Sequence, residues 1–246
     1  MTSPENLFVL TERGSAIEES VFEDWYDNEH IPLRLELPNS LFASVTRWVA
    51  ADGKTPYHLA LYDLSLPDAT SHPTYAALGG SRSPREVDIL AKLAYLDRRV
   101  YTPFGREPVG AKREGYDERN QGPFMIVVEL AVKDGPENEA EVERWYLEEH
   151  LDDLKKIPGW VRSRVWRVKE VLSVWGTSVD ASAPQKAPAK IVALHELEDP
   201  AVLGGPEFQH AVGTEFSKRI LSEVTSGMET RLFKFLRGWE NKPQGA

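Results

Sequence analysis

The feature that most constrains this chain is a six-residue motif that occurs twice. Residues 25–30 read Trp-Tyr-Asp-Asn-Glu-His, and residues 145–150 read Trp-Tyr-Leu-Glu-Glu-His. The second copy begins 120 residues after the first, which is close to half of the 246-residue chain. Internal repeats on this scale are typical of folds built from copies of one unit. The motif therefore predicts two similar units, each organised around a helix that carries a Tyr and a His.

Two further pairs of segments keep the copies aligned. Leu-Ala-Leu-Tyr-Asp-Leu at residues 59–64 matches Val-Ala-Leu-His-Glu-Leu at 192–197, and Pro-Thr-Tyr at 73–75 matches Pro-Glu-Phe at 206–208. Both pairs have an offset of 133 residues. The extra residues of the second copy fall mostly in a loop that we expect over residues 173–189.

A linker separates the two copies. Residues 106–122 are polar and contain several Gly and Pro residues, which is typical of a connecting segment. We therefore expect a first repeat over residues 1–105 and a second repeat over residues 123–246.

Each repeat reads strand, helix, strand, strand, helix, strand, because alternating apolar residues predict strands and helical spacing predicts helices. The expected strands cover residues 7–10, 43–50, 58–64, 98–104, 124–132, 160–168, 191–197 and 228–236. The expected helices cover residues 16–37, 83–93, 139–156 and 206–224. Pro32 would kink or end the first helix near residues 29–31. His30 would then lie at a helix C-terminus, where the dipole favours its protonated form.

This order of elements predicts an α+β fold made of two ferredoxin-like βαββαβ repeats. One such unit has helices on one face of its antiparallel sheet and leaves the other face bare. Two copies can cover each other by packing sheet to sheet, as an intrachain pseudo-dimeric α+β barrel. The alternative is two independent ferredoxin-like domains on a flexible tether, which would leave an apolar sheet face exposed.

Composition limits the function classes. The chain has 29 Lys and Arg residues against 39 Asp and Glu residues, a net charge of −10, so nucleic acids and anionic membranes are poor partners. It has no cysteine, which excludes disulfides, thiolate metal sites and Cys nucleophiles. The N-terminus does not resemble a signal peptide, and no apolar run approaches the roughly 20 residues of a membrane span. We expect a cytoplasmic protein.

The leading candidates for catalysis are the two Tyr/His pairs of the repeated motif. Tyr26 and His30 are four residues apart on one helix face, and so are Tyr146 and His150. A His beside a phenol in an apolar pocket can move a proton near neutral pH. The alternative is that each His packs or caps the end of its helix and each Tyr belongs to the core.

Several aromatic residues are candidates for substrate binding. Tyr62 and His195 occupy equivalent strand positions and can donate hydrogen bonds, although either can also be a residue with its polar tip at the sheet edge. The tryptophans can form flat walls for an aromatic ligand, although most buried tryptophans are core residues. The tryptophans considered are Trp25, Trp48 and Trp166.

Two aligned arginines, Arg47 and Arg167, can bind a carboxylate or phenolate, but a structural ion pair with acids of the first helix is the preferred interpretation. The sequence has no glycine-rich phosphate loop and no Gly-x-Ser-x-Gly elbow. Residues that could bind a metal are present, namely His30, His150, His195, Asp27 and Glu29, so a metal site stays open, but no ligand pair has a recognised metal spacing. We expect no metal and no other cofactor.

The first motif resembles a known family. Phe22, the segment from Trp25 to Leu33, Pro38 and Arg47 together resemble the EthD-like group of the dimeric α+β barrel superfamily. The second copy departs from this pattern, because Asp152 stands in the place of Pro32 and Leu147 in the place of Asp27.

The superfamily includes muconolactone-type isomerases, cofactor-free quinone-forming monooxygenases, polyketide-modifying enzymes and heme proteins. The resemblance implies a small-molecule pocket between the helices and the sheet of each half. It also implies that, if one half has lost activity, it is the second.

The leading hypothesis is a cofactor-independent enzyme that uses His/Tyr proton transfer on a small aromatic or polyketide-like substrate. The reaction would be an isomerisation, dehydration, cyclisation or decarboxylation. The alternatives are a small-molecule carrier, a cofactor-free monooxygenase and a structural protein without a pocket. Two chains can also associate as a homodimer.

Overall fold

The computed structural model describes residues 4–105, 109–117, 121–176 and 189–241. Its strands all belong to one sheet. They are β1 (Glu5–Glu12), β2 (Phe42–Ala50), β3 (His58–Leu64), β4 (Tyr95–Pro103), β5 (Gly110–Lys112), β6 (Phe124–Val132), β7 (Trp160–Gly176), β8 (Ile191–Leu197) and β9 (Thr225–Glu240).

The helices occur in two groups, one in each half of the chain. The α-helices are α1 (Glu19–Trp25), α2 (Ile31–Leu35), α3 (Pro73–Ala77), α4 (Pro84–Lys92), α5 (Pro136–Trp145), α6 (Leu151–Leu154), α7 (Pro206–Gly213) and α8 (Glu215–Arg219). Three π turns cover Tyr26–His30, Tyr146–His150 and Ile220–Val224. Short 3₁₀ turns cover Pro38–Ser40, Ala69–Ser71, Leu78–Gly80 and Pro200–Gly204.

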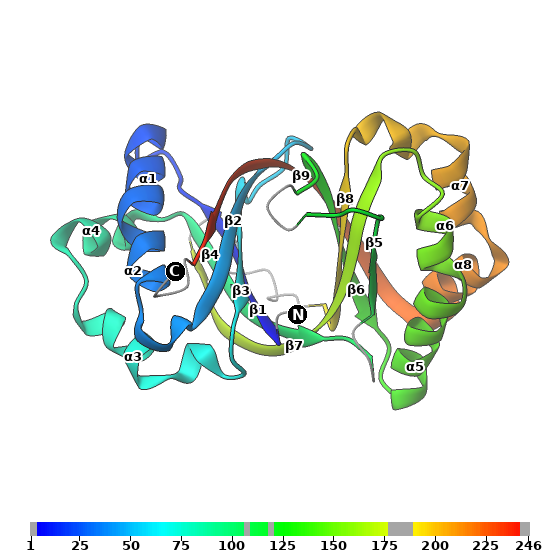
Figure 1. Ribbon diagram of the computed structural model, residues 1–246, viewed down its shortest axis with the longest axis horizontal. Coiled ribbons are helices and arrows are strands. Elements are labelled where there is room, and N and C mark those ends of the chain that lie inside the picture. Colours follow the sequence, from blue (N-terminus) through cyan, green and yellow to red (C-terminus); the bar gives the residue numbers. More distant parts are fainter. Residues whose placement is uncertain (1–3, 106–108, 118–120, 177–188, 242–246) are drawn as a thin grey trace.

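The two halves have the same strand order and close into one barrel. The first half runs β4-β1-β3-β2, and the second half runs β9-β6-β8-β7. β2 pairs with β9, and β4 pairs with β7, so the two four-stranded sheets join at both edges. β5 pairs with β7 on the same edge as β4, just beyond the end of β4. The predicted fold class is confirmed: two ferredoxin-like βαββαβ repeats form an intrachain α+β barrel (Figure 1).

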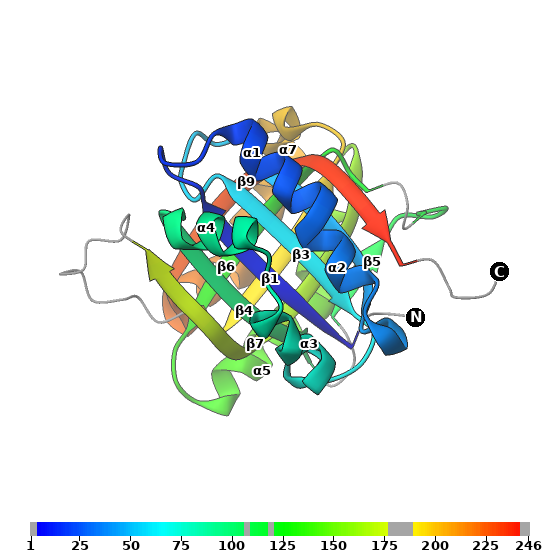
Figure 2. The same ribbon diagram turned by 90° about the vertical axis from the view of Figure 1, so that its left-hand side faces the viewer.

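Alternation along the strands separates three apolar cores. Side chains such as Phe8, Trp48, Met125, Trp166 and Phe233 fill the barrel interior. The opposite faces of the same strands pack under helices, α1 to α4 on the first half and α5 to α8 on the second (Figure 1). Figure 2 shows α1 and α2 running in one line across the outer face of the first sheet, with α4 and α3 beside them. Because neighbouring side chains on a strand point to opposite faces, each strand serves two cores.

The first predicted helix continues past the expected break. Residues 16–37 contain α1, a π turn and α2, and the chain stays helical through Leu35. The expectation that His30 lies at a helix C-terminus is therefore wrong. The free carbonyl groups of this helix, and the negative end of its dipole, lie at the end of α2. The dipole therefore does not favour a protonated His30.

Two other predicted segments differ from the structure. The helix expected over 206–224 is interrupted at Thr214, which has an extended backbone and acts as the N-cap of α8. Residues 173–176, expected in a loop, continue β7, because their backbone pairs with β4. The remainder of that loop, residues 177–188, lies outside the described residues.

Candidate active site

A π turn shapes the first copy of the repeated motif. The backbone N–H of Ile31 donates to the carbonyl of Tyr26, five residues earlier, so the turn between α1 and α2 is widened. Residues five apart lie about 140° apart on an α-helix, whereas a π turn brings them close to one side. The rings of Trp25 and Tyr26 therefore both contact His30, with centroid separations of 4.6 Å and 4.9 Å.

The second copy has the same turn. Leu151 donates its backbone N–H to the carbonyl of Tyr146, and Trp145 stacks on His150 with ring centroids 4.1 Å apart. Asp152 stands here in the place of Pro32. The proline is therefore not required for the widened turn. The five-residue spacing from Trp to His is kept in both copies because the turn places these two rings in contact.

The glutamate of the motif joins the two helices of each repeat. In the first repeat, the N-cap residue of α4, Ser83, donates its hydroxyl to Glu29 over 2.5 Å. In the second repeat, the N-cap residue of α8, Thr214, donates to Glu149 over 2.5 Å. The Glu therefore has one structural role in both copies, since it holds the start of the later helix against the π turn.

A cavity of about 490 Å³ lies between the helices and the sheet of the first repeat. Trp25, Tyr26 and His30 line it from the π turn, and Tyr62 lines it from β3. Leu172 of β7 also lines it, so the second repeat completes the wall. Its volume falls in the range of small-molecule sites.

His30 forms a buried pair with Glu86 at the wall of this cavity. Nδ1 of His30 lies 2.8 Å from Oε1 of Glu86, and the two side chains are only 13% and 4% exposed. An ionised carboxylate only accepts hydrogen bonds, so Nδ1 of His30 carries the proton in this contact. Among the described residues, no group hydrogen-bonds to Nε2. In neutral His30 that nitrogen is therefore an acceptor available to a ligand.

The surroundings of His30 favour its neutral form. Burial lowers its pKa well below 6.5, and the positive charges of Arg34 and Arg98 act in the same direction. The nearby Glu86 carboxylate opposes this effect. Its charge is shared with Arg34, which lies 3.7 Å away, so burial determines the direction of the shift. His30 is consequently neutral at neutral pH.

Two tyrosines supply donors beside the histidine. The hydroxyl of Tyr62 donates to the hydroxyl of Tyr26 over 3.1 Å, and both residues line the cavity. Burial raises the pKa of both phenols, so both stay protonated at neutral pH. Because the hydroxyl of Tyr26 accepts from Tyr62, its own hydrogen can be given to a ligand.

The corresponding residues of the second repeat form a closed network. Nδ1 of His150 lies 3.2 Å from the carbonyl oxygen of Ala211, and the indole N–H of Trp145 donates to the hydroxyl of Ser217. That hydroxyl donates in turn to the same carbonyl of Ala211. His150 and Tyr146 are buried, and neither lines the cavity described above.

His195 is also buried among neutral groups. Its Nδ1 lies 2.8 Å from the hydroxyl of Ser163, and burial lowers its pKa to about 3. Its ring lies 6.4 Å from that of His150. The structure thus brings the predicted His150, Tyr146 and His195 together, but within the packed core of the second repeat.

The remaining predicted residues divide between the two faces of the sheet. Trp25 and Tyr62 lie on the helix side and line the cavity. Trp48 and Trp166 lie in the barrel interior, on the face opposite His30. Because side chains alternate along a strand, neither of these tryptophans meets a ligand bound beside His30.

Arg47 and Arg167 form the ion pairs expected from the sequence, but the prediction that they are aligned is wrong. Arg47 lies opposite Ala60, whereas the matching Ala193 lies opposite Val165. Arg47 binds Glu23 over 2.7 Å and Asp27 over 2.5 Å, both on the first helix. Arg167 binds Glu139 of α5 over 2.5 Å. The preferred structural interpretation of both arginines is confirmed.

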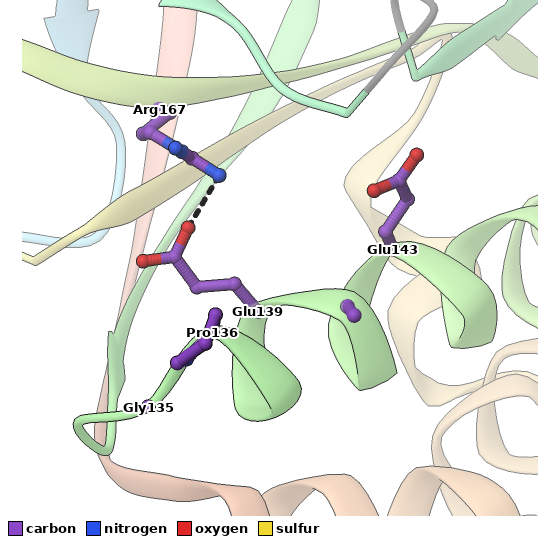
Figure 3. A pocket seen from close by; sticks show the side chains of 6 residues that line it. Gly135, Pro136, Glu139, Glu143 and Arg167 are labelled. Atoms are coloured by element: carbon purple, nitrogen blue, oxygen red, sulfur yellow. Dashed lines mark ion pairs between the residues drawn. The ribbon is translucent and has the colours of Figure 1, made fainter.

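A second and shallower cavity, of about 340 Å³, lies at the start of α5. It is lined by Gly135, Pro136, Glu139, Glu143 and Arg167 (Figure 3). Figure 3 shows Arg167 reaching across it to Glu139, so its arginine is already paired. None of the predicted catalytic residues lines this cavity.

Sequence reasoning missed Glu86. The sequence does contain one local pattern at this residue. Ser83 and Glu86 have the spacing of a helix capping box, and Ser83 caps α4 in the structure. That spacing predicts a helix start but not a contact with His30, which lies 56 residues earlier. Arg34, Arg82 and Arg98 at the cavity were missed for the same reason, since their meeting depends on tertiary packing.

Comparison with solved structures identifies the fold. The chain is similar to an anthrone oxidase-like protein at a TM-score of 0.63 and 10% identity, covering 98% of this chain and 94% of the other. It is also similar to a proposed monooxygenase from Fusobacterium nucleatum, at a TM-score of 0.51 and 9% identity, covering 96% and 93%. A proposed chlorite dismutase has a TM-score of 0.51 at 12% identity, covering 96% of both chains.

These structures are ferredoxin-like proteins of the dimeric α+β barrel type, and the likeness extends over nearly the whole chain. A scan against protein-family models finds no match, and neither does a search of the curated proteins.

Two further observations concern membranes and metals. No helix within the described ranges is long and apolar enough to cross a membrane. In the same part of the chain, no group of three or more His, Asp or Glu side chains is arranged to hold a metal ion.

Proposed function

We propose that this protein is a small-molecule enzyme whose reaction centre is the His30–Glu86 pair. One contrast carries the proposal. His30 pairs with a carboxylate at the wall of a ligand-sized cavity, whereas His150 lies in a packed and hydrogen-bonded network. A neutral imidazole held by a carboxylate, with its second nitrogen free, is the arrangement that general-base catalysis needs.

The chemistry follows from the donors and acceptors beside the cavity. Nε2 of His30 takes a proton from a carbon or oxygen atom of the substrate, and Glu86 stabilises the imidazolium that forms. The electron pair moves to a neighbouring carbonyl oxygen, to which Tyr26 donates its hydrogen bond. Returning the proton at another atom completes an isomerisation, and expelling a leaving group completes an elimination.

An aromatic or polyketide-like substrate fits the walls. Trp25, Tyr75 and several leucines line the cavity beside the polar groups, so a flat and largely apolar molecule can be buried there. This assignment requires no bound cofactor. Membership of the EthD-like group and an origin by tandem duplication belong to the same proposal. They are supported by the shared strand order and by the π turn present in both halves.

A cofactor-free monooxygenase is the second candidate, because two structurally similar proteins are described as an anthrone oxidase-like protein and a proposed monooxygenase. Both candidates begin with removal of a proton by His30. They differ in whether the resulting carbanion then reacts with dioxygen. Oxidation of anthrone in this way consumes one O₂ and yields anthraquinone and one water.

Anthrone is a suitable probe, since its benzylic CH₂ beside the aromatic rings is a carbon acid. We would follow deuterium incorporation into anthrone in D₂O under nitrogen by proton NMR, and anthraquinone formation in air by absorbance. The wild-type protein should accelerate exchange, and His30→Gln should lower the enzymatic rate about 100-fold or more. Glu86→Gln should lower it less, because the base remains while its positioning carboxylate is lost.

His150→Gln is the matched control, because it alters the same motif position in the second repeat. It should leave the exchange rate unchanged. Equal rates in wild-type and His30→Gln proteins, with both folded by circular dichroism, would refute the proposal. Exchange without anthraquinone in air favours isomerase-type chemistry, and anthraquinone formation that depends on His30 favours the monooxygenase. Tight binding without either reaction identifies a carrier.

A further inference from the structure

The cavity beside His30 has an unbalanced positive charge. Three arginines line it, Arg34, Arg82 and Arg98, against one carboxylate, Glu86. The whole chain carries a net charge of −10, so this local excess runs against the overall composition. Arg98 is half-buried, and a half-buried charge without a charged partner is costly, which makes this excess informative.

Two of these arginines have no carboxylate partner. These two are Arg82 and Arg98. The third, Arg34, donates to the carbonyl of His30 over 2.6 Å and lies 3.7 Å from Glu86. Arg98 donates only to the neutral hydroxyl of Tyr75, over 2.7 Å, and Arg82 forms no hydrogen bond or ion pair within the described part of the chain. Apart from Arg13, which donates to backbone carbonyls, every other described arginine forms an ion pair.

The positions of Arg82 and Arg98 indicate which end of a bound ligand they would contact. Arg82 is exposed and lies in the loop before α4, so it stands at the mouth of the cavity. Arg98 is half-buried on β4, and its bond to Tyr75 fixes the guanidinium beside an aromatic wall. A ligand group that contacts both arginines would lie at the mouth of the cavity, at the end of the ligand that is farther from His30.

We propose that Arg82 and Arg98 form an anion-binding subsite, and that the ligand of this cavity is an aromatic molecule carrying a carboxylate. The inference rests on the proposed function for one point, that the reacting end of the ligand lies beside His30. The negative charge of the ligand is inferred from the arginines alone. Arginine binds carboxylates through two parallel N–H donors, and the flat ring would lie against Tyr75, Leu90 and Leu93.

The other cavity provides an internal comparison. Its arginine, Arg167, already binds Glu139, so no free guanidinium is offered to a ligand there. Arg167→Met is therefore a matched control, because it also removes an arginine from a cavity wall of this protein.

The test uses a pair of probes that differ in charge and little else. We would measure binding of 2-naphthoate and of 2-naphthamide to the full chain by isothermal titration calorimetry at low salt. The wild-type protein should bind 2-naphthoate at least tenfold more tightly than 2-naphthamide. Arg98→Met should lower naphthoate affinity about tenfold and leave naphthamide affinity unchanged. Arg82→Met should give a smaller loss, because solvent screens this exposed residue, and its exposed position makes a folding defect unexpected.

Arg167→Met should bind both probes as the wild type does. The inference is overturned if 2-naphthoate does not bind at millimolar concentration, or if both naphthalene probes bind equally. It is also overturned if neither Arg82→Met nor Arg98→Met changes the preference. Failure of the proposed function would look different, since naphthoate would still bind selectively while anthrone exchange did not depend on His30.

Discussion

Acid should destabilise this protein at an unusually high pH, because it buries several histidines in their neutral form. His58, His150 and His195 are each less than 10% exposed. Burial lowers the pKa of His58 and His195 to about 3 and that of His150 to about 4. For His58, burial is joined by the positive charge of Arg47. Glu23 lies 3.7 Å from its ring but is already bound by Arg47, so it does not reverse the shift.

The sign of the effect follows from proton binding. In the unfolded chain each histidine titrates near 6.5, whereas in the native state these three stay neutral until well below pH 5. The unfolded state therefore binds more protons as the pH falls, and the stability present above pH 6.5 is progressively lost. Each histidine contributes about 2 kcal/mol of this loss at pH 5, or about 6 kcal/mol for the three. His30, whose pKa is also lowered by burial, acts in the same direction.

Urea unfolding at pH 7.5 and at pH 5.0, followed by circular dichroism, measures this loss. Most carboxylates stay ionised in both states across that window, so the histidines dominate the difference. Glu129 acts in the opposite sense, because burial raises its pKa. A domain of this kind has only about 5–15 kcal/mol of stability, so we expect it to be marginal at pH 5.

His58→Leu is the variant that isolates one histidine. Both ring nitrogens of His58 are buried without a hydrogen-bond partner, and the ring packs 4.6 Å from that of Phe22. The variant should reduce the pH dependence by about 2 kcal/mol. A loss of stability below about 2 kcal/mol between pH 7.5 and 5.0 in the wild type, or an unchanged pH dependence in His58→Leu, would refute this reasoning.

Two other substitutions test the structural roles of the networks. Arg47→Met should destabilise the fold by about 3 kcal/mol in urea unfolding at pH 7.5, because it removes a guanidinium that binds the buried carboxylate of Asp27; an unchanged midpoint would contradict a structural role for Arg47. Ser217→Ala should cost about 1–3 kcal/mol, because it leaves the indole N–H of Trp145 buried without an acceptor. The same variant should not change anthrone exchange, and a large change there would contradict the assignment of the reaction centre to the first repeat.

The sequence was sufficient to predict the fold because several anchors repeat in one order. Tyr62 and His195 were aligned from the sequence, and they occupy the matching strands β3 and β8 of the two sheets. Alternation within β2 was equally informative. If Arg47 pairs with acids of the first helix, it points to the helix side, and its neighbour Trp48 must then point into the barrel. The expected ion pair and a binding role for Trp48 beside His30 were therefore inconsistent with each other.

The π turn and the partner of His30 could not be predicted in the same way. The spacing of apolar residues distinguishes poorly between a regular helix and a helix with a single π turn. The π turn shifts the apolar pattern by only one residue. The contact from His30 to Glu86 depends on how α4 lies across the sheet. No local pattern determines that placement.

The difference between the two repeats depends largely on one position outside the repeated motif. Glu86 is the third residue after the N-cap of α4, and Ser217 is the third residue after the N-cap of α8. In the first repeat this position holds a carboxylate that binds His30, while the indole N–H of Trp25 has no partner among the described residues. In the second, it holds a hydroxyl that satisfies Trp145. The motif common to both copies therefore marks the joint between two helices. The residue that the later helix presents to that joint is a carboxylate paired with the histidine in the first repeat, and a hydroxyl bonded to the tryptophan in the second.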